Sequence, residues 1–228
     1  MLRLRPHLHL ALFGLAIAVV ARAADPSPDE ILKKALDIRR GVQDYTATVT
    51  LHADLPGVKT QDRTVKVYYK QPDKLHLESK QVAIIPKDAL LFGNLEKHLD
   101  QAKITLVEHA RGAGRDLYKL KLTRQDADQS APYLLVSVNA ANFTLSRIEA
   151  WGGGAQRMWF DFEHGLVRGK YWMPLRITCW LRRGPNTGHH FDPDDRHASS
   201  HPGGKFTVAF SDYQVNSGLS DSLFQDAK

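Results

Sequence analysis

Apolar and polar residues alternate with a period of two along most of the chain, the pattern of β-strands that bury one face. The first such segment, Tyr45 to Asp54, alternates Tyr, Ala, Val and Leu with Thr, His and Asp. We expect further strands at 65–69, from 75 onward, and at 104–109, 117–123, 133–138, 143–151, 157–162, 174–181 and 206–215. About ten consecutive strands joined by short turns favour one large antiparallel meander, which must curl to bury a face.

A different period marks residues 27–41, where apolar positions follow helical spacing. Ser27 is suited to the N-cap, Pro28 to the first helical position, and Glu30 completes a capping box. The apolar stripe consists of Ile31, Leu32, Ala35 and Leu36. This amphipathic helix is expected to act as a lid on the sheet.

Two segments interrupt the strand pattern. Residues 86–99 contain the apolar triplet Leu90-Leu91-Phe92 and are expected to form a short helix or an apolar loop. Residues 184–204 are rich in Gly, Pro, His and Asp, which predicts a long exposed loop. No internal repeat or linker is evident, so the chain from residue 24 to residue 228 is interpreted as one domain mainly of β structure (α+β).

The first 23 residues have the order of a cleavable signal peptide. Arg3 and Arg5 precede an apolar run of 11 residues from Leu10 to Val20, and Ala21-Arg22-Ala23 offers a small-x-small cleavage site. A membrane-spanning helix needs about 20 apolar residues, so a permanent anchor is not expected. We therefore expect export to the periplasm. The chain has one cysteine, Cys179, and none at the cleavage point, so no lipid anchor is expected there.

Composition narrows the candidate partners. The net charge of +6 becomes +3 when Arg3, Arg5 and Arg22 leave with the signal peptide. Without a block of Lys and Arg, this charge indicates no nucleic-acid partner. With a single cysteine the domain has no internal disulfide, and it is expected to be a monomer.

No catalytic motif emerges from the sequence. A GxSxG motif and a glycine-rich phosphate loop are both absent. Asp161 and Glu163 share one strand face while His164 points to the other, so they form no acid–base constellation. We expect neither an enzyme nor a cofactor.

Histidines gather in the polar loop and raise an alternative. His189, His190, His197 and His201 lie within 13 residues beside several Asp residues, and imidazole and carboxylate groups suit zinc, copper or nickel. Their spacing matches no defined metal site, so a solvated loop is preferred and no metal is assigned.

Four segments resemble a known family: ILKKALDIRRGVQDYTATVTL, YYKQPDKLHLES, GKYWMPLRIT and the closing FSDYQVNSGLSDSLF. Together with the preceding signal peptide, they are similar to the outer-membrane lipoprotein-sorting proteins of the LolA-like superfamily. The resemblance implies an incomplete antiparallel β-barrel covered by helices, with an apolar cavity for acyl chains. It implies a periplasmic carrier that binds lipoprotein acyl chains, lipid or another apolar ligand. The alternative is a periplasmic sensor or interaction module that binds a membrane protein or lipoprotein without transport.

The expected cavity and lid side chains are the apolar residues of the helix, the early strands and the triplet, with two tryptophans. They are Ile31, Leu32, Leu36, Val49, Leu51, Val67, Tyr69, Leu75, Leu77, Leu90, Leu91, Phe92, Trp159 and Trp172. From sequence alone a packed core and an open cavity have the same composition.

Overall fold

The computed structural model describes residues 25–55, 60–78, 102–112, 115–128, 130–152, 155–182 and 202–225. The expected signal peptide, the segment 86–99 and most of the His-rich loop lie outside these residues. The described elements are α1 (Pro28–Asp37), β1 (Asp44–Asp54), β2 (Arg63–Lys70), β3 (Lys74–Glu78), β4 (Ala102–Gly112), β5 (Arg115–Arg124), β6 (Tyr133–Asn139), β7 (Leu145–Gly152), β8 (Ala155–Val167), β9 (Tyr171–Arg182), β10 (Pro202–Val215) and the 3-10 helix η1 (Asp221–Phe224).

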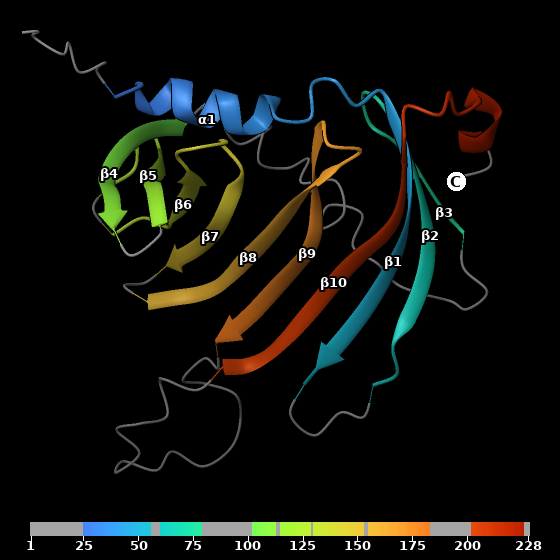
Figure 1. Cartoon of the computed structure of the whole chain (residues 1–228). Coiled ribbons are helices and arrows are strands. Elements are labelled where there is room, and N and C mark those ends of the chain that lie inside the picture. Colours follow the sequence, from blue (N-terminus) through green and yellow to red (C-terminus); the bar gives the residue numbers. More distant parts are fainter. Residues whose placement is uncertain are drawn as a thin grey trace, which may run out of the picture.

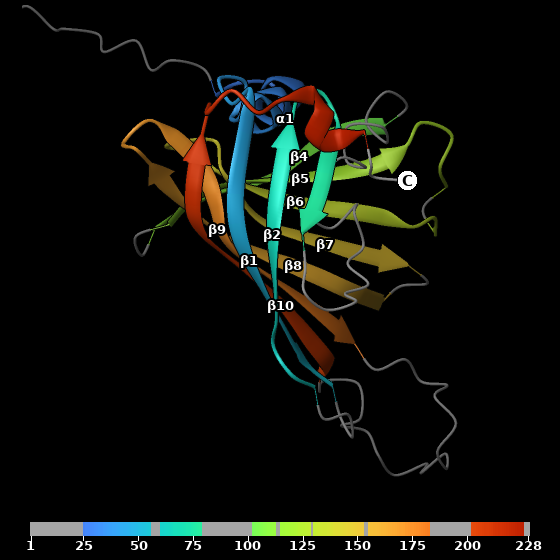
Figure 2. The ribbon, with the colours of Figure 1, turned by 90° about the vertical axis from the view of Figure 1, so that its right-hand side faces the viewer.

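The described strands form one ten-stranded antiparallel sheet in the order β3-β2-β1-β10-β9-β8-β7-β6-β5-β4. The last strand lies between β1 and β9, so β3 and β4 become the two edges of an open, strongly curled sheet (Figure 1). Seen from the side, β4 to β7 cross behind β1, β2 and β10 (Figure 2). The expected fold class, an incomplete barrel, is confirmed.

Helix α1 begins where the sequence predicts. The Ser27 hydroxyl accepts a hydrogen bond from the Glu30 N–H at 3.3 Å, and Glu30 Oε2 accepts one from the Ser27 N–H at 2.9 Å. These reciprocal bonds satisfy two N–H groups that a helix start otherwise leaves unpaired. They also hold the pKa of the Glu30 carboxyl below its ordinary value, the Ser27 backbone bond having the largest effect.

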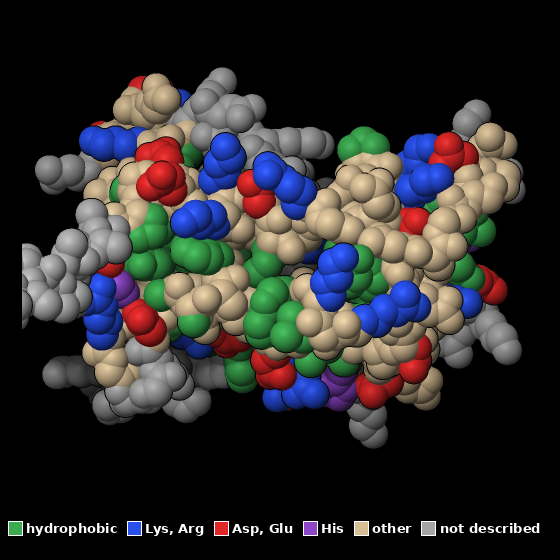
Figure 3. Space-filling model, turned by 45° about the horizontal axis from the view of Figure 1, so that its top comes forward, with side chains coloured by type: hydrophobic (Ala, Val, Ile, Leu, Met, Phe, Trp, Pro, Cys, Tyr) green, Lys and Arg blue, Asp and Glu red, His purple; other side chains and the backbone are tan. Residues whose placement is uncertain are grey.

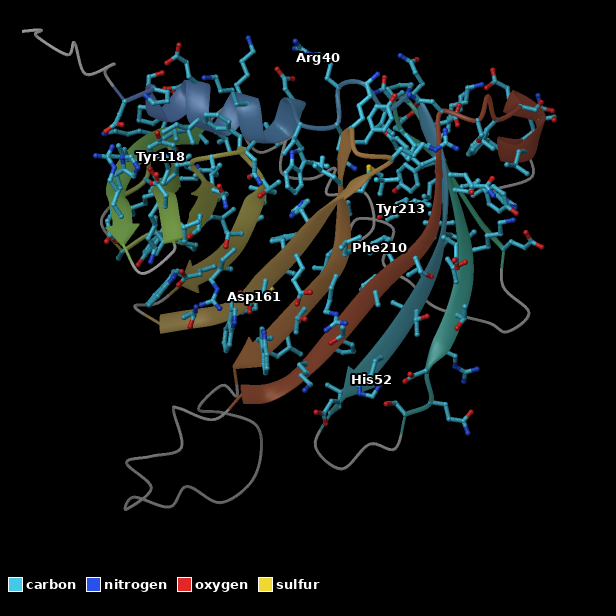
Figure 4. The ribbon with its side chains drawn as sticks, in the orientation of Figure 1. Arg40, His52, Tyr118, Asp161, Phe210 and Tyr213 are labelled. Atoms are coloured by element: carbon cyan, nitrogen blue, oxygen red, sulfur yellow. The ribbon has the colours of Figure 1, made fainter. Side chains whose placement is uncertain are left out.

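The core consists of two clusters on the inner face of the sheet, the face that α1 covers in part. One cluster joins α1 to β5, β6 and β7 and is centred on Ile31, Leu32, Leu120, Val136 and Val138. Figure 4 shows Tyr118 of this cluster beneath α1. The other cluster lies on β1, β2, β3, β9 and β10. The half-buried ring of Phe162 packs against both clusters and so connects them.

Polar contacts fix the chain just before α1 to the sheet edge. His109 lies between two carboxylates, with Nδ1 3.2 Å from Asp25 and Nε2 2.7 Å from Asp116. Arg111 also pairs with Asp25, at 3.0 Å. This cluster links the start of the helix to β4 and β5, and so positions α1 over that half of the sheet.

Candidate functional site

One row of apolar side chains runs across the inner face of eight strands. Its members lie directly opposite one another in the strand pairings: Ala53, Phe206, Cys179, Phe160, Ile148, Val136, Leu120 and Leu106. We refer to these eight residues as the inner row. A second row lies two residues away along six of these strands. It consists of Leu181, Met158, Ala150, Leu134, Leu122 and Ile104. Strand alternation places both rows on the face of the core clusters.

Exposure changes along the inner row. Leu120 and Val136, which lie beneath α1, are 0 % exposed, whereas Phe206 on β10 is 38 % exposed. Phe160 and Cys179, between them and Phe206, are half-buried. The helix therefore covers one half of the inner row and leaves an accessible apolar surface on β8, β9, β10 and β1.

Three titratable side chains of the inner face are neutral at pH 7. Burial raises the pKa of the Cys179 thiol, which keeps the group in the neutral form. Deeper in the curl, burial and the nearby Arg39 charge lower the pKa of His164 to about 4, so its imidazole is neutral at pH 7. Burial likewise raises the pKa of Tyr45 to about 12. These groups therefore add no net charge to the inner face at neutral pH.

Most of the expected cavity and lid residues lie on the inner face. Ile31, Leu32, Val49, Val67 and Leu75 are buried in the two clusters. The half-buried members of the set pack against those clusters: Leu36, Leu51, Tyr69 and Leu77. Burial of these residues positions α1 and shapes the sheet, but it leaves them less accessible than Phe206. Leu90, Leu91 and Phe92 lie outside the described residues.

The two tryptophans of the expected set are placed elsewhere. Trp159 alternates with the core-facing Phe160 and lies on the outer face, stacked on Trp180 with ring centroids 5.7 Å apart. Trp172 alternates with Tyr171 and Met173, which both belong to the core, and lies opposite the exposed Leu166. Strand alternation thus places both side chains on the face opposite the core clusters, and a ligand-binding role for them stays a prediction.

The accessible part of the inner row was not named from the sequence. Phe206, Cys179 and Phe160 are far apart in the sequence, and only the pairing of β8, β9 and β10 makes them neighbours. The available signal was the shared parity of Phe206, Val208 and Phe210, which marks one strand face.

The two carboxylates on the outer face, Asp161 and Glu149, already have hydrogen-bond partners within the sheet. Asp161 accepts hydrogen bonds from Arg147 Nε at 2.6 Å and Trp180 Nε1 at 3.0 Å. Glu149 accepts them from Trp151 Nε1 at 3.3 Å and Gln156 Nε2 at 3.0 Å. Both carboxylates therefore connect neighbouring strands through hydrogen bonds. In Figure 4, Asp161 lies on β8 and His52 lies well away from it, at the far end of β1.

No metal site is found among the residues that the structure describes. His189, His190, His197 and His201 lie outside them, so the metal alternative stays a hypothesis. The described part of the polar segment differs from expectation at one end, because 202–204 belong to β10 rather than to a loop. Within the same described ranges, no helix has the length and apolar character needed to cross a membrane.

No family model and no curated protein matches the sequence. Solved structures do match the geometry. A LolA superfamily protein from Nitrosomonas europaea is similar, with a TM-score of 0.56 over 89 % of this chain and 99 % of its own, at 14 % identity. The chain has a LolA-like fold.

Two further structures agree with this assignment. A domain named as an outer membrane lipoprotein-sorting protein, from Vibrio parahaemolyticus, has a TM-score of 0.57 over 87 % of this chain and 96 % of its own, at 14 % identity. A DUF1329 family protein from Desulfovibrio piger has a TM-score of 0.58 over 89 % and 99 %, also at 14 % identity. The family resemblance in the sequence is thus confirmed at the level of the fold.

Proposed function

We propose that this LolA-like protein is a periplasmic carrier that binds an acyl chain or another apolar ligand on its inner face. The observation that carries the proposal is the inner row, an apolar surface across eight strands whose half on β8, β9, β10 and β1 remains accessible to solvent. Transferring apolar surface from water to such a face stabilises a complex by about 0.8 kcal/mol per buried methylene. The curled sheet offers this surface without closing around it.

A binding role is favoured over catalysis by the state of the polar groups. Asp161 is already paired with Arg147 and Trp180, burial keeps the Cys179 thiol protonated, and a pKa of about 4, from burial and the Arg39 charge, makes His164 a weak base. A nucleophile or a general base would need a group activated by its neighbours. The similar fold of a lipoprotein-sorting domain also supports a carrier, and the signal-peptide pattern at residues 1–23 supports a periplasmic location.

The proposal is tested by uptake of a fluorescent fatty acid by the mature protein. Wild-type protein should bind the probe saturably. Phe206→Asp places a charge on the accessible half of the inner row and should weaken binding roughly tenfold or more. The matched control is Thr207→Asp, because Thr207 is the next residue of β10 and faces the other side of the sheet. It should bind like wild type.

Two results would count against a carrier. Equal weakening by Phe206→Asp and Thr207→Asp would show that the inner row is not the site. No uptake by the wild type, together with stoichiometric binding of one membrane protein, would favour the sensor or interaction module instead. Native mass spectrometry of protein purified from a membrane-containing extract distinguishes these, since a carrier should retain lipid.

A further inference from the structure

The hairpin that joins β8 to β9 exposes an unusual amount of apolar surface. Leu166 is 50 % exposed and Leu175 is 42 % exposed, two of the four large apolar side chains that are exposed among the described residues. Trp172 lies directly opposite Leu166 and is half-buried. The Leu175 side chain lies over Gly165, which pairs with the core residue Met173, so Leu175 is on the other face of the hairpin from Leu166 and Trp172.

The same hairpin carries several cations. Residues 163–176 include Arg168, Lys170 and Arg176, all exposed, and one carboxylate, Glu163. Within the described parts of the chain none of the three cations forms an ion pair, although Lys170 Nζ lies 5.1 Å from the centroid of the Tyr171 ring. Figure 3 shows Lys and Arg side chains distributed around hydrophobic ones on the face that includes α1.

The hairpin is built to hold its shape. Arg168 and Gly169 have φ values of 53° and 63°, and the Lys170 N–H donates to the Val167 carbonyl at 3.2 Å. Two successive positive φ values are typical of a tight type I′ turn, which matches the twist of paired strands. Val167, Tyr171 and Met173 pack into the core from one side, which leaves Leu166 and Trp172 on the other. Binding through this tip therefore requires little ordering.

From this combination we propose that the β8–β9 hairpin docks the protein onto an anionic phospholipid bilayer. The side chains of Leu166 and Trp172 favour the interface between headgroups and acyl chains, while Arg168 and Lys170 at the tip are attracted to anionic headgroups. A protein partner would be expected to neutralise the cations with its own carboxylates, whereas a bilayer uses the apolar and cationic groups together. This surface is separate from the inner row and does not depend on what that row binds.

Cosedimentation with lipid vesicles tests the docking surface. The mature protein should sediment with vesicles of phosphatidylcholine and phosphatidylglycerol, bind pure phosphatidylcholine less, and be released by salt. Leu166→Ser and Lys170→Glu should each weaken binding by roughly fivefold or more.

Matched controls come from β4. Val107 is 55 % exposed and Lys103 is exposed, so Val107→Ser and Lys103→Glu remove the same kinds of group from another surface. Both controls should bind like wild type, and circular dichroism should show all four variants folded. The proposal is overturned if wild-type protein fails to sediment with anionic vesicles, if salt and phosphatidylglycerol have no effect, or if the hairpin variants bind as well as the controls.

Discussion

The side-chain carboxylate of Asp44 accepts a hydrogen bond from the backbone N–H of Ser217 at 2.8 Å. The same carboxylate accepts further bonds from the Gly218 N–H at 3.0 Å and the Leu219 N–H at 3.3 Å. Asp44 is only 4 % exposed and stands at the start of β1. It therefore fixes the segment that follows β10 against the start of the first strand.

Replacing this carboxylate should destabilise the whole domain. Asp44→Ala removes the acceptor of several backbone N–H groups and should lower the free energy of unfolding by roughly 3 kcal/mol, because hydrogen bonds to charged groups are strong and buried unpaired groups are costly. Urea denaturation measures the effect. Asp73→Ala, in the exposed turn between β2 and β3, is the control and should change stability little. Similar losses in both variants would contradict the role given to Asp44.

Helix α1 should shield the covered half of the inner row. Ile31 is 0 % exposed, so Ile31→Ser places a hydroxyl in the core and should cost about 3 kcal/mol. Loosening the helix should uncover Leu120 and Val136 and raise the fluorescence of a hydrophobic dye. Lys33→Ser, on the exposed side of the same helix, should leave dye binding unchanged. If Ile31→Ser also leaves dye binding unchanged, α1 does not shield this half of the inner row.

His164 should make the domain less stable in mild acid. Its Nδ1 is buried without a hydrogen-bond partner among the described residues, and burial with the Arg39 charge lowers its pKa from 6.5 to about 4. The unfolded chain therefore takes up the proton first as pH falls. The contribution of the neutral imidazole to stability is complete above pH 6.5 and is lost progressively toward pH 4, by roughly 3 kcal/mol at most.

His164→Leu isolates this effect. Urea denaturation at several values of pH should show a shallower loss of stability below pH 6.5 in the variant than in the wild type. His52→Gln is the control, because His52 is exposed beside Asp62. An unchanged pH dependence in His164→Leu would mean that other groups carry the acid sensitivity.

Alternation was sufficient to predict most strands but not their order. The sequence shows Tyr45 to Asp54 and Phe206 to Val215 as separate strands, and nothing local indicates that they pair. Their pairing depends on contacts between residues more than 150 positions apart, such as the hydrogen bonds that the Asp44 carboxylate accepts from the N–H groups of Ser217, Gly218 and Leu219. Local propensity carries no information on such contacts, whereas the capping box of α1 involves neighbours and could be predicted.

The placement of the tryptophans shows where parity helps and where it fails. Trp159 has the parity of Asp161 and Glu163, so the sequence held enough information to put it on their face. Around Trp172 both parities are apolar, with Tyr171 and Met173 on one and Pro174 on the other. Because apolar residues occupy both faces there, the sequence pattern does not show which face is buried. Only the packing of the core in the structure distinguishes them.

Cys179, the only cysteine in the chain, provides a direct probe of the inner row. It lies between Phe160 and Phe206 in the strand pairings, is half-buried, and burial raises the pKa of its thiol. Its reaction with a disulfide reagent should therefore be roughly tenfold or more slower in the native protein than in urea. A bound fatty acid should slow it further by covering the sulfur. In a Cys179→Ser background, Thr207→Cys puts a thiol on the opposite face of β10, where the same fatty acid should not change the rate. Equal protection of both thiols would indicate a general effect of the lipid, and protection of neither would place the ligand away from the inner row.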